Sequence, residues 1–148
     1  MTNIFESLRA DHDIQRDLID ELVATTGDSP DRHELFERLT RELTAHADQE
    51  ERHFYVPLIR ADLTQEKARH SVAEHHELDE LVEKLETYEW ASSQWLTTAE
   101  QLRHQLVHHL DEEEQEVFQL AGKVLTDDEK VDLGEQYRNA MTAARANA

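Results

Sequence analysis

Histidines and glutamates that recur in two equivalent sets are the residues of this chain best suited to chemistry. Each set contains an isolated histidine, followed further along the chain by a His-x-x-x-Glu motif. The first set is His12, His46 and Glu50, and the second set is His75, His109 and Glu113. On a helix, residues four apart share one face with roughly 6 Å of rise between them, so each motif can present both side chains to one centre. Imidazole and carboxylate together suit iron, manganese or zinc.

The two sets belong to an internal repeat. The first and second halves align without gaps at an offset of 63 residues, which pairs apolar positions such as Leu22 and Leu85 as well as the histidines. Each half is predicted to form a helical hairpin, so the folded pair would present four imidazoles and two carboxylates with approximate two-fold symmetry. Buried groups of this kind are costly unless they are paired or metal-bound. The pattern therefore predicts a site for two metal ions.

Helices must position these residues, and the composition favours helices. Three glycines and two prolines in 148 residues leave few places to turn. The apolar periodicity and the capping residues predict four long helices. The first covers Phe5 to Leu22, the second follows the cap Ser29 with Pro30 at its first position, the third follows Thr64, and the fourth ends before Gly122.

A short fifth helix is predicted after these four, over about 126–143. Thr126 and Glu129 have capping-box spacing at its start, although Gly134 disfavours a helix there. Pro57 is expected to bend or close the last turns of the second long helix. We therefore predict an all-α, up-down-up-down four-helix bundle, with a single domain over 1–148 and a bundle core over about 3–125.

Charge and composition exclude several classes of function. The 34 acidic and 15 basic side chains give a formal net charge of −19, which disfavours nucleic acid or an anionic membrane surface as a partner. The chain has no cysteine, so thiolate metal sites and disulfides are excluded. The sequence shows no leader-like segment, no apolar run that could span a membrane and no phosphate-binding loop or serine nucleophile motif. We expect a cytoplasmic protein, monomeric or homodimeric, that is neither a hydrolase nor an NTPase.

The motifs extend beyond single ligand positions. They are Asp11-His12, His46-Ala47-Asp48-Gln49-Glu50-Glu51 before Phe54-Tyr55-Val56-Pro57, Glu74-His75, and His109-Leu110-Asp111-Glu112-Glu113-Glu114 before Val117-Phe118. This ordered set, which spans about 4–125, resembles the hemerythrin-like or HHE cation-binding domains. The resemblance implies a non-haem di-iron centre inside a four-helix bundle, which reacts with dioxygen, hydrogen peroxide or nitric oxide. Two glutamates supply only part of the countercharge of two irons, so we expect an oxide or hydroxide bridge between them.

The resemblance also assigns roles to individual residues. The four terminal nitrogen ligands would be His12, His46, His75 and His109. Glu50 and Glu113 would bridge or cap the irons, and no catalytic residue separate from the ligands and no organic cofactor is expected. If the register were shifted by one residue, Glu51 and Glu114 would be the carboxylate ligands instead.

The sequence departs from oxygen-carrying hemerythrins at two positions. Those carriers place a second histidine four residues before the one matched by His75, where this chain has Ser71, and the nearest histidine is His70. Either His70, Asp79 or water fills that position, or it stays open. The carriers also use an aspartate five residues after their last histidine, whereas this chain has Glu114 there and its candidate ligand at the fourth. These differences argue against reversible oxygen carriage and leave peroxide or oxidase-type chemistry open.

Other residues were weighed as competing ligands. His76 and His108 adjoin the chosen histidines, but they fall on polar helix faces, and His53 forms a ferritin-like Glu-x-x-His pair that the second half does not repeat. Tyr55 and Phe118 are equivalent in the repeat and are expected to pack, although a tyrosine beside iron could tune an oxidant.

Three functions follow from this sequence. The first is an enzyme-like removal of hydrogen peroxide or oxidation of nitric oxide, in an oxidative or nitrosative stress response. The second is a module that binds, stores or senses oxygen or iron without turnover. The third is a metal-free structural bundle, which the paired ligand spacing disfavours.

Overall fold

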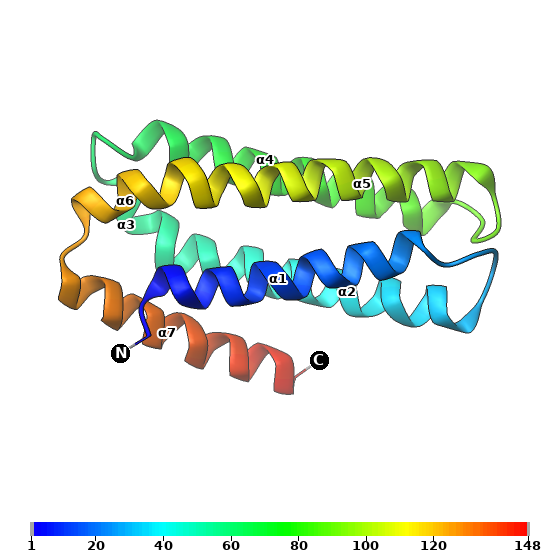
Figure 1. The fold of residues 1–148 in the computed structure, drawn as a ribbon, viewed down its shortest axis with the longest axis horizontal. Helices are drawn as coiled ribbons and strands as arrows, with labels where there is room; N and C mark the ends of the chain where they lie inside the picture. The colour runs from blue at the N-terminus through cyan, green and yellow to red at the C-terminus, as the bar shows by residue number, and fades with distance from the viewer. Residues whose placement is uncertain (1, 148) are drawn as a thin grey trace.

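Four helical arms run lengthwise beside one another in the computed structural model, which describes residues 2–147 (Figure 1). Two arms are single helices, α1 (Ile4–Val23) and α4 (Gln65–Thr87). Each of the other two arms is a composite of three successive helical segments. The second arm is α2 (Pro30–Glu50), η1 (Glu51–Tyr55) and α3 (Val56–Ile59), and the fourth is α5 (Ser93–Glu112), η2 (Glu113–Val117) and α6 (Phe118–Val124). Short turns connect successive arms, which confirms the predicted up-down-up-down bundle.

Local hydrogen bonds that the sequence predicts fix the starts of several helices. The Ser29 side chain accepts a hydrogen bond from the backbone N–H of Arg32, with Pro30 in the first turn. The pair Thr126 and Glu129 forms a complete capping box. Thr64 acts differently from a cap, because its hydroxyl donates to the carbonyl of Leu58 at 2.6 Å and so fixes the turn before α4.

The composite arms contain a feature that the sequence did not predict. Both η1 and η2 are five-residue π-helical turns, in which each N–H bonds to the carbonyl five residues earlier. The first begins directly after Glu50, and the second begins at Glu113. Isolated π-turns within α-helices are rare and occur often at functional sites. Here each π-turn shifts the hydrogen-bond register of its arm by one residue, and it does so next to a glutamate of the repeated motif. The second arm ends at Ile59, two residues beyond Pro57.

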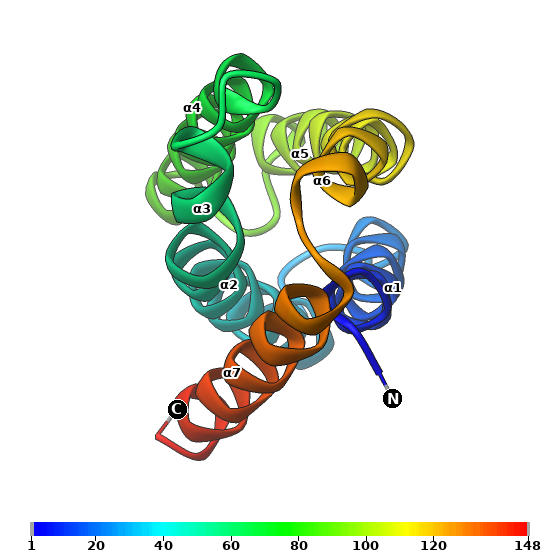
Figure 2. The ribbon, with the colours of Figure 1, turned by 90° about the vertical axis from the view of Figure 1, so that its left-hand side faces the viewer.

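The fifth helix of the prediction, α7 (Asp127–Ala146), is not short. It has 20 residues, as many as α1, and packs against α1 and α2 on the outside of the bundle (Figure 2). Gly134 does not weaken it. A Cβ at this position would lie 2.7 Å from backbone atoms of Asn3 and Ile4, so the glycine permits the close approach of α7 to the start of α1.

Two separate clusters of buried apolar side chains hold the arms together. One includes Leu22, Leu85 and Trp95 and fills the end of the bundle near the α1–α2 and α4–α5 turns. The other includes Leu8 and Phe54 and fills the end that α7 covers. On the first three arms, the repeated histidines and glutamates lie between the segments that form these clusters, and on the fourth arm Glu113 does so while His109 lies among leucines of the first cluster. The arms therefore enclose a polar layer between two apolar ones.

No helix that the structure describes offers the length of apolar sequence that a bilayer crossing requires.

Candidate metal centre

All six residues predicted as ligands converge in the polar layer. Each is at most 5% exposed, and both glutamates are at most 1% exposed. Their ligand atoms form two overlapping groups, in each of which the atoms lie within 4.8 Å of one another. One group is His12, His46, Glu50 and Glu113, and the other is His75, His109, Glu50 and Glu113. Because both glutamates belong to both groups, the arrangement suits two neighbouring cations that share two carboxylates.

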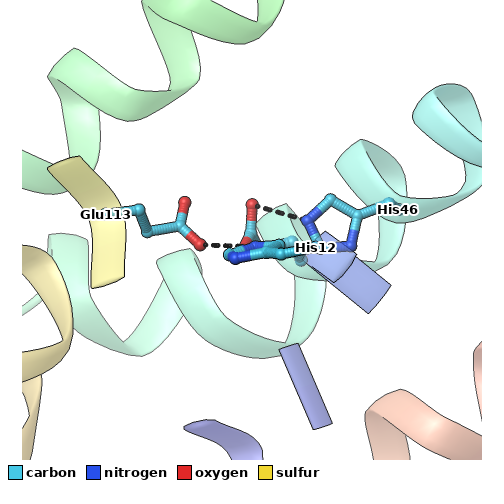
Figure 3. A group of neighbouring side chains, drawn as sticks. His12, His46 and Glu113 are labelled. Carbon is cyan, nitrogen blue, oxygen red and sulfur yellow. Dashed lines mark ion pairs between the residues drawn. The ribbon is translucent and has the colours of Figure 1, made fainter. Parts of the chain in front are cut away.

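The Nε2 atom of each histidine faces these carboxylates. His12 Nε2 lies 3.2 Å from Glu113, and His75 Nε2 lies 3.2 Å from Glu50. His46 and His109 lie 3.4 and 3.6 Å from the glutamate of their own motif. Ligands bound about 2.1 Å from one ion are themselves roughly 3 to 3.5 Å apart, so these separations fit a cation between them. Figure 3 shows how His12, His46 and Glu113 point toward one another from three different elements.

The same atoms lack hydrogen bonds. Among the described residues, no hydrogen-bond partner exists for Nε2 of His12, His46 and His109, for either oxygen of Glu50, or for Oε1 of Glu113. Buried polar atoms are almost always satisfied in proteins, and leaving one unpaired is costly. Six such atoms within the two overlapping groups are donors that cations would use, so the residues fit a metal centre.

The outward-facing nitrogens of the histidines are all engaged. The Nδ1 atoms of His12 and His109 lie 2.7 and 2.8 Å from Glu114 and Glu74, and that of His75 lies 3.1 Å from Glu51. A carboxylate accepts the Nδ1 proton in each pair, so Nε2 is the nitrogen that would bind a cation once it carries no proton. Glu51 and Glu114 are thus placed behind the histidines rather than in the centre.

His46 is held by a longer chain of contacts. Its Nδ1 lies 2.6 Å from the hydroxyl of Tyr137, which donates its own proton to Asp11 at 2.6 Å. His46 Nδ1 must therefore donate to the phenol oxygen, so Nε2 is the nitrogen that faces Glu50. Arg145 pairs with Asp11 at 2.8 Å and balances its charge. The helix α7 thus supplies both a buried phenol and a cation behind this histidine.

The repeat explains how these contacts differ between the halves. Glu51 supports His75, and Glu114 supports His12, so each half supplies a carboxylate to the other half's isolated histidine. Asp11 and Glu74 are also equivalent in the repeat. Glu74 contacts His109 directly, whereas the shorter Asp11 reaches His46 only through Tyr137. The sequence contained a signal for these carboxylates, since an acidic residue precedes both isolated histidines, but none for Tyr137.

Tyr55 does more than pack. It is fully buried, and its hydroxyl donates a hydrogen bond to Glu113 inside the centre. Burial raises the pKa of Tyr55 well above its ordinary value, as do the charges of Glu113 and Glu50, and a contact with Ser71 acts in the opposite direction. Because serine is small, the phenol oxygen lies beside the position where oxygen carriers have their second histidine.

The glutamates and histidines of the centre shift one another's pKa values. Burial alone would raise the pKa of Glu50, but His46 and His12 hold it well below its ordinary value. Burial and the nearby charge of Glu50 raise the pKa of Glu113. Burial lowers the pKa of His75, but the adjacent carboxylates of Glu50 and Glu51 outweigh this effect and raise it to about 10. Without a cation, a proton on His75 thus compensates part of the carboxylate charge.

The competing candidates lie outside this centre. His76 and Asp79 are exposed, and the side chain of His108 is 66% exposed and pairs with Glu112. His70 is also outside, because its side chain is 55% exposed and contacts Glu74 and Glu112. His53 is half-buried beyond the centre. The position beside Ser71 is therefore filled by neither His70 nor Asp79.

The fold and the site together define a helical bundle that binds metal cations between its arms. A family model described as the hemerythrin HHE cation binding domain matches residues 3–121. The chain therefore belongs to the hemerythrin HHE cation-binding family, as its motifs predicted. No curated protein matches the sequence.

A solved structure supports the same assignment. It is the crystal structure of a hemerythrin HHE cation binding domain-containing protein from Mycobacterium kansasii. The two chains are 25% identical and superpose with a TM-score of 0.89, over 99% of this chain and 90% of the other. Because the likeness covers nearly all of this chain, it includes α7 as well as the four arms.

Proposed function

We propose that this protein holds two iron ions and uses them to bind and turn over a small oxidant, namely hydrogen peroxide, dioxygen or nitric oxide. The observation that carries the proposal is the pair of four-residue groups that share Glu50 and Glu113. Two imidazoles on each side and two common carboxylates suit iron in either of its usual oxidation states. Iron bound there would supply one-electron redox chemistry and Lewis acidity.

The chain's own residues would prepare the site in three ways. The carboxylates behind His12, His75 and His109 hold each imidazole in the tautomer that a metal requires. Glu50 and Glu113 neutralise part of the positive charge of the ions, and an oxide or hydroxide bridge would neutralise more. The two apolar clusters exclude water above and below, which strengthens electrostatic interactions in the layer between them.

Tyr55 is a further candidate ligand in this proposal. Its hydroxyl already lies on a carboxylate of the centre, and a bound cation would favour loss of its proton, as metal ions do for other acidic ligands. A phenolate at this place would fill the coordination position that Ser71 leaves. Oxygen carriers have a histidine ligand at the position of Ser71. Because this chain lacks it, we favour turnover of an oxidant over reversible oxygen carriage.

The decisive experiment is to load the purified protein with ferrous iron and measure its metal content, its optical spectrum and its reactions. We expect about two irons per chain, near-ultraviolet absorption of a bridged ferric pair, and consumption of hydrogen peroxide or nitric oxide. Tight iron loading without consumption of either oxidant would favour a storage or sensing module instead. A protein that takes up no iron, or prefers zinc or manganese, would contradict the proposal.

Tyr55→Phe tests the additional ligand. We expect this variant to keep its iron but to lose any visible absorption band that arises from phenolate-to-iron charge transfer. Tyr88→Phe is a suitable control, because Tyr88 lies at the other end of the bundle, next to the cluster of Leu85 and Trp95. A spectrum that both variants share with the unmodified protein would exclude Tyr55 as a ligand.

A further inference from the structure

Two further His-x-x-x-Glu motifs occur in this chain, and both lie outside the buried centre. One is His70 with Glu74 on α4, and the other is His108 with Glu112 on α5. Both histidines are exposed and both glutamates are partly exposed. The spacing is that of the inward-facing motifs, and it places an imidazole and a carboxylate on one side of each helix. The same types of ligand are therefore present on the surface of the bundle.

The two outer motifs meet across the contact between α4 and α5. The Nε2 atom of His70 lies 3.5 Å from Glu74 on its own helix and 3.5 Å from Glu112 on the neighbouring helix. One ligand atom from each of these three residues lies within 4.8 Å of the other two. Ligands of one cation are themselves roughly 3 to 3.5 Å apart, so this geometry resembles that of the buried groups. The second histidine, His108, lies 3.1 Å from the other oxygen of Glu112 and fixes that carboxylate.

The carboxylates of Glu74 and Glu112 have no permanent positive charge beside them. Among residues 2–147, only histidines form ion pairs with either carboxylate. The side chains of Glu74 and Glu112 are 14% and 19% exposed, so water screens their mutual repulsion only in part. An imidazole is positively charged only when it is protonated, and a neutral imidazole offers a lone pair instead. A metal cation between the three residues would use that lone pair and remove the repulsion.

The internal repeat shows how the other half satisfies the equivalent carboxylate. Glu74 corresponds to Asp11, and Arg145 of α7 pairs with Asp11 at 2.8 Å. Figure 2 shows α7 on the side of α1 and α2, whereas α4 and α5 lie on the far side of the bundle. The half that α7 covers thus receives a cation from the protein itself. The uncovered half presents its carboxylate to solvent, where a dissolved cation can take the corresponding place.

The duplication does not account for the other two residues of the cluster. The residues equivalent to His70 and Glu112 are Ser7 and Gln49, which are both uncharged. The second half therefore has an imidazole and an additional carboxylate where the first half has neither. These two residues occur together on the face that α7 leaves open, and they complete a set of three potential metal ligands.

We propose that His70, Glu74 and Glu112 bind one divalent transition-metal cation at the surface, in addition to the ions of the buried centre. One imidazole and two carboxylates suit ferrous, manganous or zinc ions, and water completes the coordination on the exposed side. The two sites share a carboxylate, because one oxygen of Glu74 faces His70 and the other accepts the Nδ1 proton of His109. Since its ligands are exposed, the surface cation exchanges with solvent, and gel filtration removes it while the buried ions stay in place.

The test is equilibrium dialysis of iron-loaded, gel-filtered protein against Zn²⁺, with excess Mg²⁺ present to occupy sites that offer only oxygen ligands. His70→Ala removes the imidazole and keeps both carboxylates. We expect the unmodified protein to bind about one Zn²⁺ per chain more than this variant, with the same iron content in both. His76→Ala is the matched control, because His76 is exposed on the same helix, and it should bind zinc as the unmodified protein does.

Two outcomes of this comparison would overturn the proposal. Equal zinc binding by His70→Ala and the unmodified protein would mean that the acidic surface attracts cations without a defined site. A lower iron content in His70→Ala would place this histidine in the buried centre instead.

Glu112→Gln tests whether the site lies between the two helices. This variant should also bind about one Zn²⁺ less per chain than the unmodified protein, without losing iron. Undiminished zinc binding would show that α5 supplies no ligand and would overturn the proposal. Glu74 is kept in both variants because it also supports His109. The measurement is a difference between variants, so failure of the unmodified protein to bind iron would contradict the proposed function and leave the test of the surface site valid.

Discussion

Each histidine of the candidate centre uses its two nitrogens for different purposes. The Nε2 atom faces the shared glutamates, and the Nδ1 atom donates to a carboxylate or phenol behind it. Such outer partners fix the orientation of a ligand and raise its basicity, and removing them commonly weakens metal binding by about 10- to 100-fold. We therefore expect metal affinity to depend on the residue behind each histidine as well as on the histidine itself.

Substitution of a single histidine tests the proposed ligand set. His109→Ala should reduce the iron content to about one ion or less per chain, and the lost metal should lower the melting temperature by several degrees. Elemental analysis and calorimetry measure the two effects. The neighbouring His108→Ala is the matched control, because its side chain is largely exposed and should change neither quantity. Equal iron in both variants would show that His109 is not a ligand.

Protons should leave the centre when metal enters it. The pKa of His75 is raised to about 10 in the metal-free protein, so this imidazole carries a proton at pH 7.5 and must lose it to bind a cation. We expect release of about one proton or more per chain, and an affinity that weakens as the pH falls below about 10. Calorimetric titration with zinc in buffers of different ionisation enthalpy measures the release.

A control for this prediction is Glu51→Gln, which removes one of the two carboxylates that favour the charged form of His75. Fewer protons should then be released. A binding enthalpy that is the same in every buffer would contradict the assignment of His75 as a protonated residue that becomes a ligand.

At the scale of elements, α7 is an integral part of the site as well as a cover for the bundle. It contributes Tyr137 to His46 and Arg145 to Asp11. Gly134 allows this approach, because any larger residue would collide with the backbone at the start of α1. The contacts place a residue from the end of the chain directly behind a candidate ligand in the second arm.

Tyr137→Phe should weaken one half of the centre selectively. The variant removes the acceptor of the His46 Nδ1 proton, so we expect affinity in the His12–His46 group to fall about 10- to 100-fold, with little change in the His75–His109 group. Glu74→Gln should produce the reverse pattern, because Glu74 supports His109. Stepwise titration with a spectroscopically visible metal such as cobalt resolves the two groups. Equal weakening of both steps in Tyr137→Phe would contradict the local role of the phenol.

The sequence predicted the elements that the repeat encodes and missed those that it does not. All six candidate ligands were predicted because the histidines, the glutamates and the leucines around them recur at one offset, and the structure brings these six buried side chains together. Tyr137 has no counterpart in the repeat, so its contact with His46 could not be inferred. Gly134 suggested a weak helix because a glycine inside a helix is usually unfavourable. Its role in the close contact with Asn3 and Ile4 could not be inferred, because these residues are distant in sequence.

The π-turns were also beyond prediction, for a different reason. In a π-turn each N–H bonds to the carbonyl five residues earlier instead of four, and this change does not alter the spacing of apolar residues in the sequence. Tyr55 illustrates the effect, since it occupies an apolar position of the periodicity yet directs its hydroxyl at Glu113. The last residue of η1 is Tyr55 itself.

For the whole molecule, the centre is a polar layer that separates two apolar cores. Each core packs on its own, and across the layer between them most of the candidate ligand atoms have no hydrogen bond that would satisfy them without a cation. The formal charge of −19 adds a general repulsion that bound cations would reduce. Metal and fold should therefore be strongly linked.

Removal of metal should accordingly destabilise the protein. With free iron at 1,000 times its dissociation constant, binding contributes about 4 kcal/mol, which corresponds to a fall in melting temperature of roughly 8 to 16 °C on chelation. Differential scanning calorimetry before and after treatment with a chelator measures this change, and restoration by added ferrous iron is the control. An unaltered melting temperature would mean that the enclosed side chains compensate one another without a cation.

The single methylene by which Asp11 is shorter than Glu74 gives the duplicated halves different electronic characters. A carboxylate that touches an imidazole directly makes it a stronger electron donor than one that acts through an intervening phenol. The ion beside His46 should then have the higher reduction potential of the two. Redox-active ions held by the two groups would therefore differ in potential, although the sequence presents the two groups as nearly symmetric.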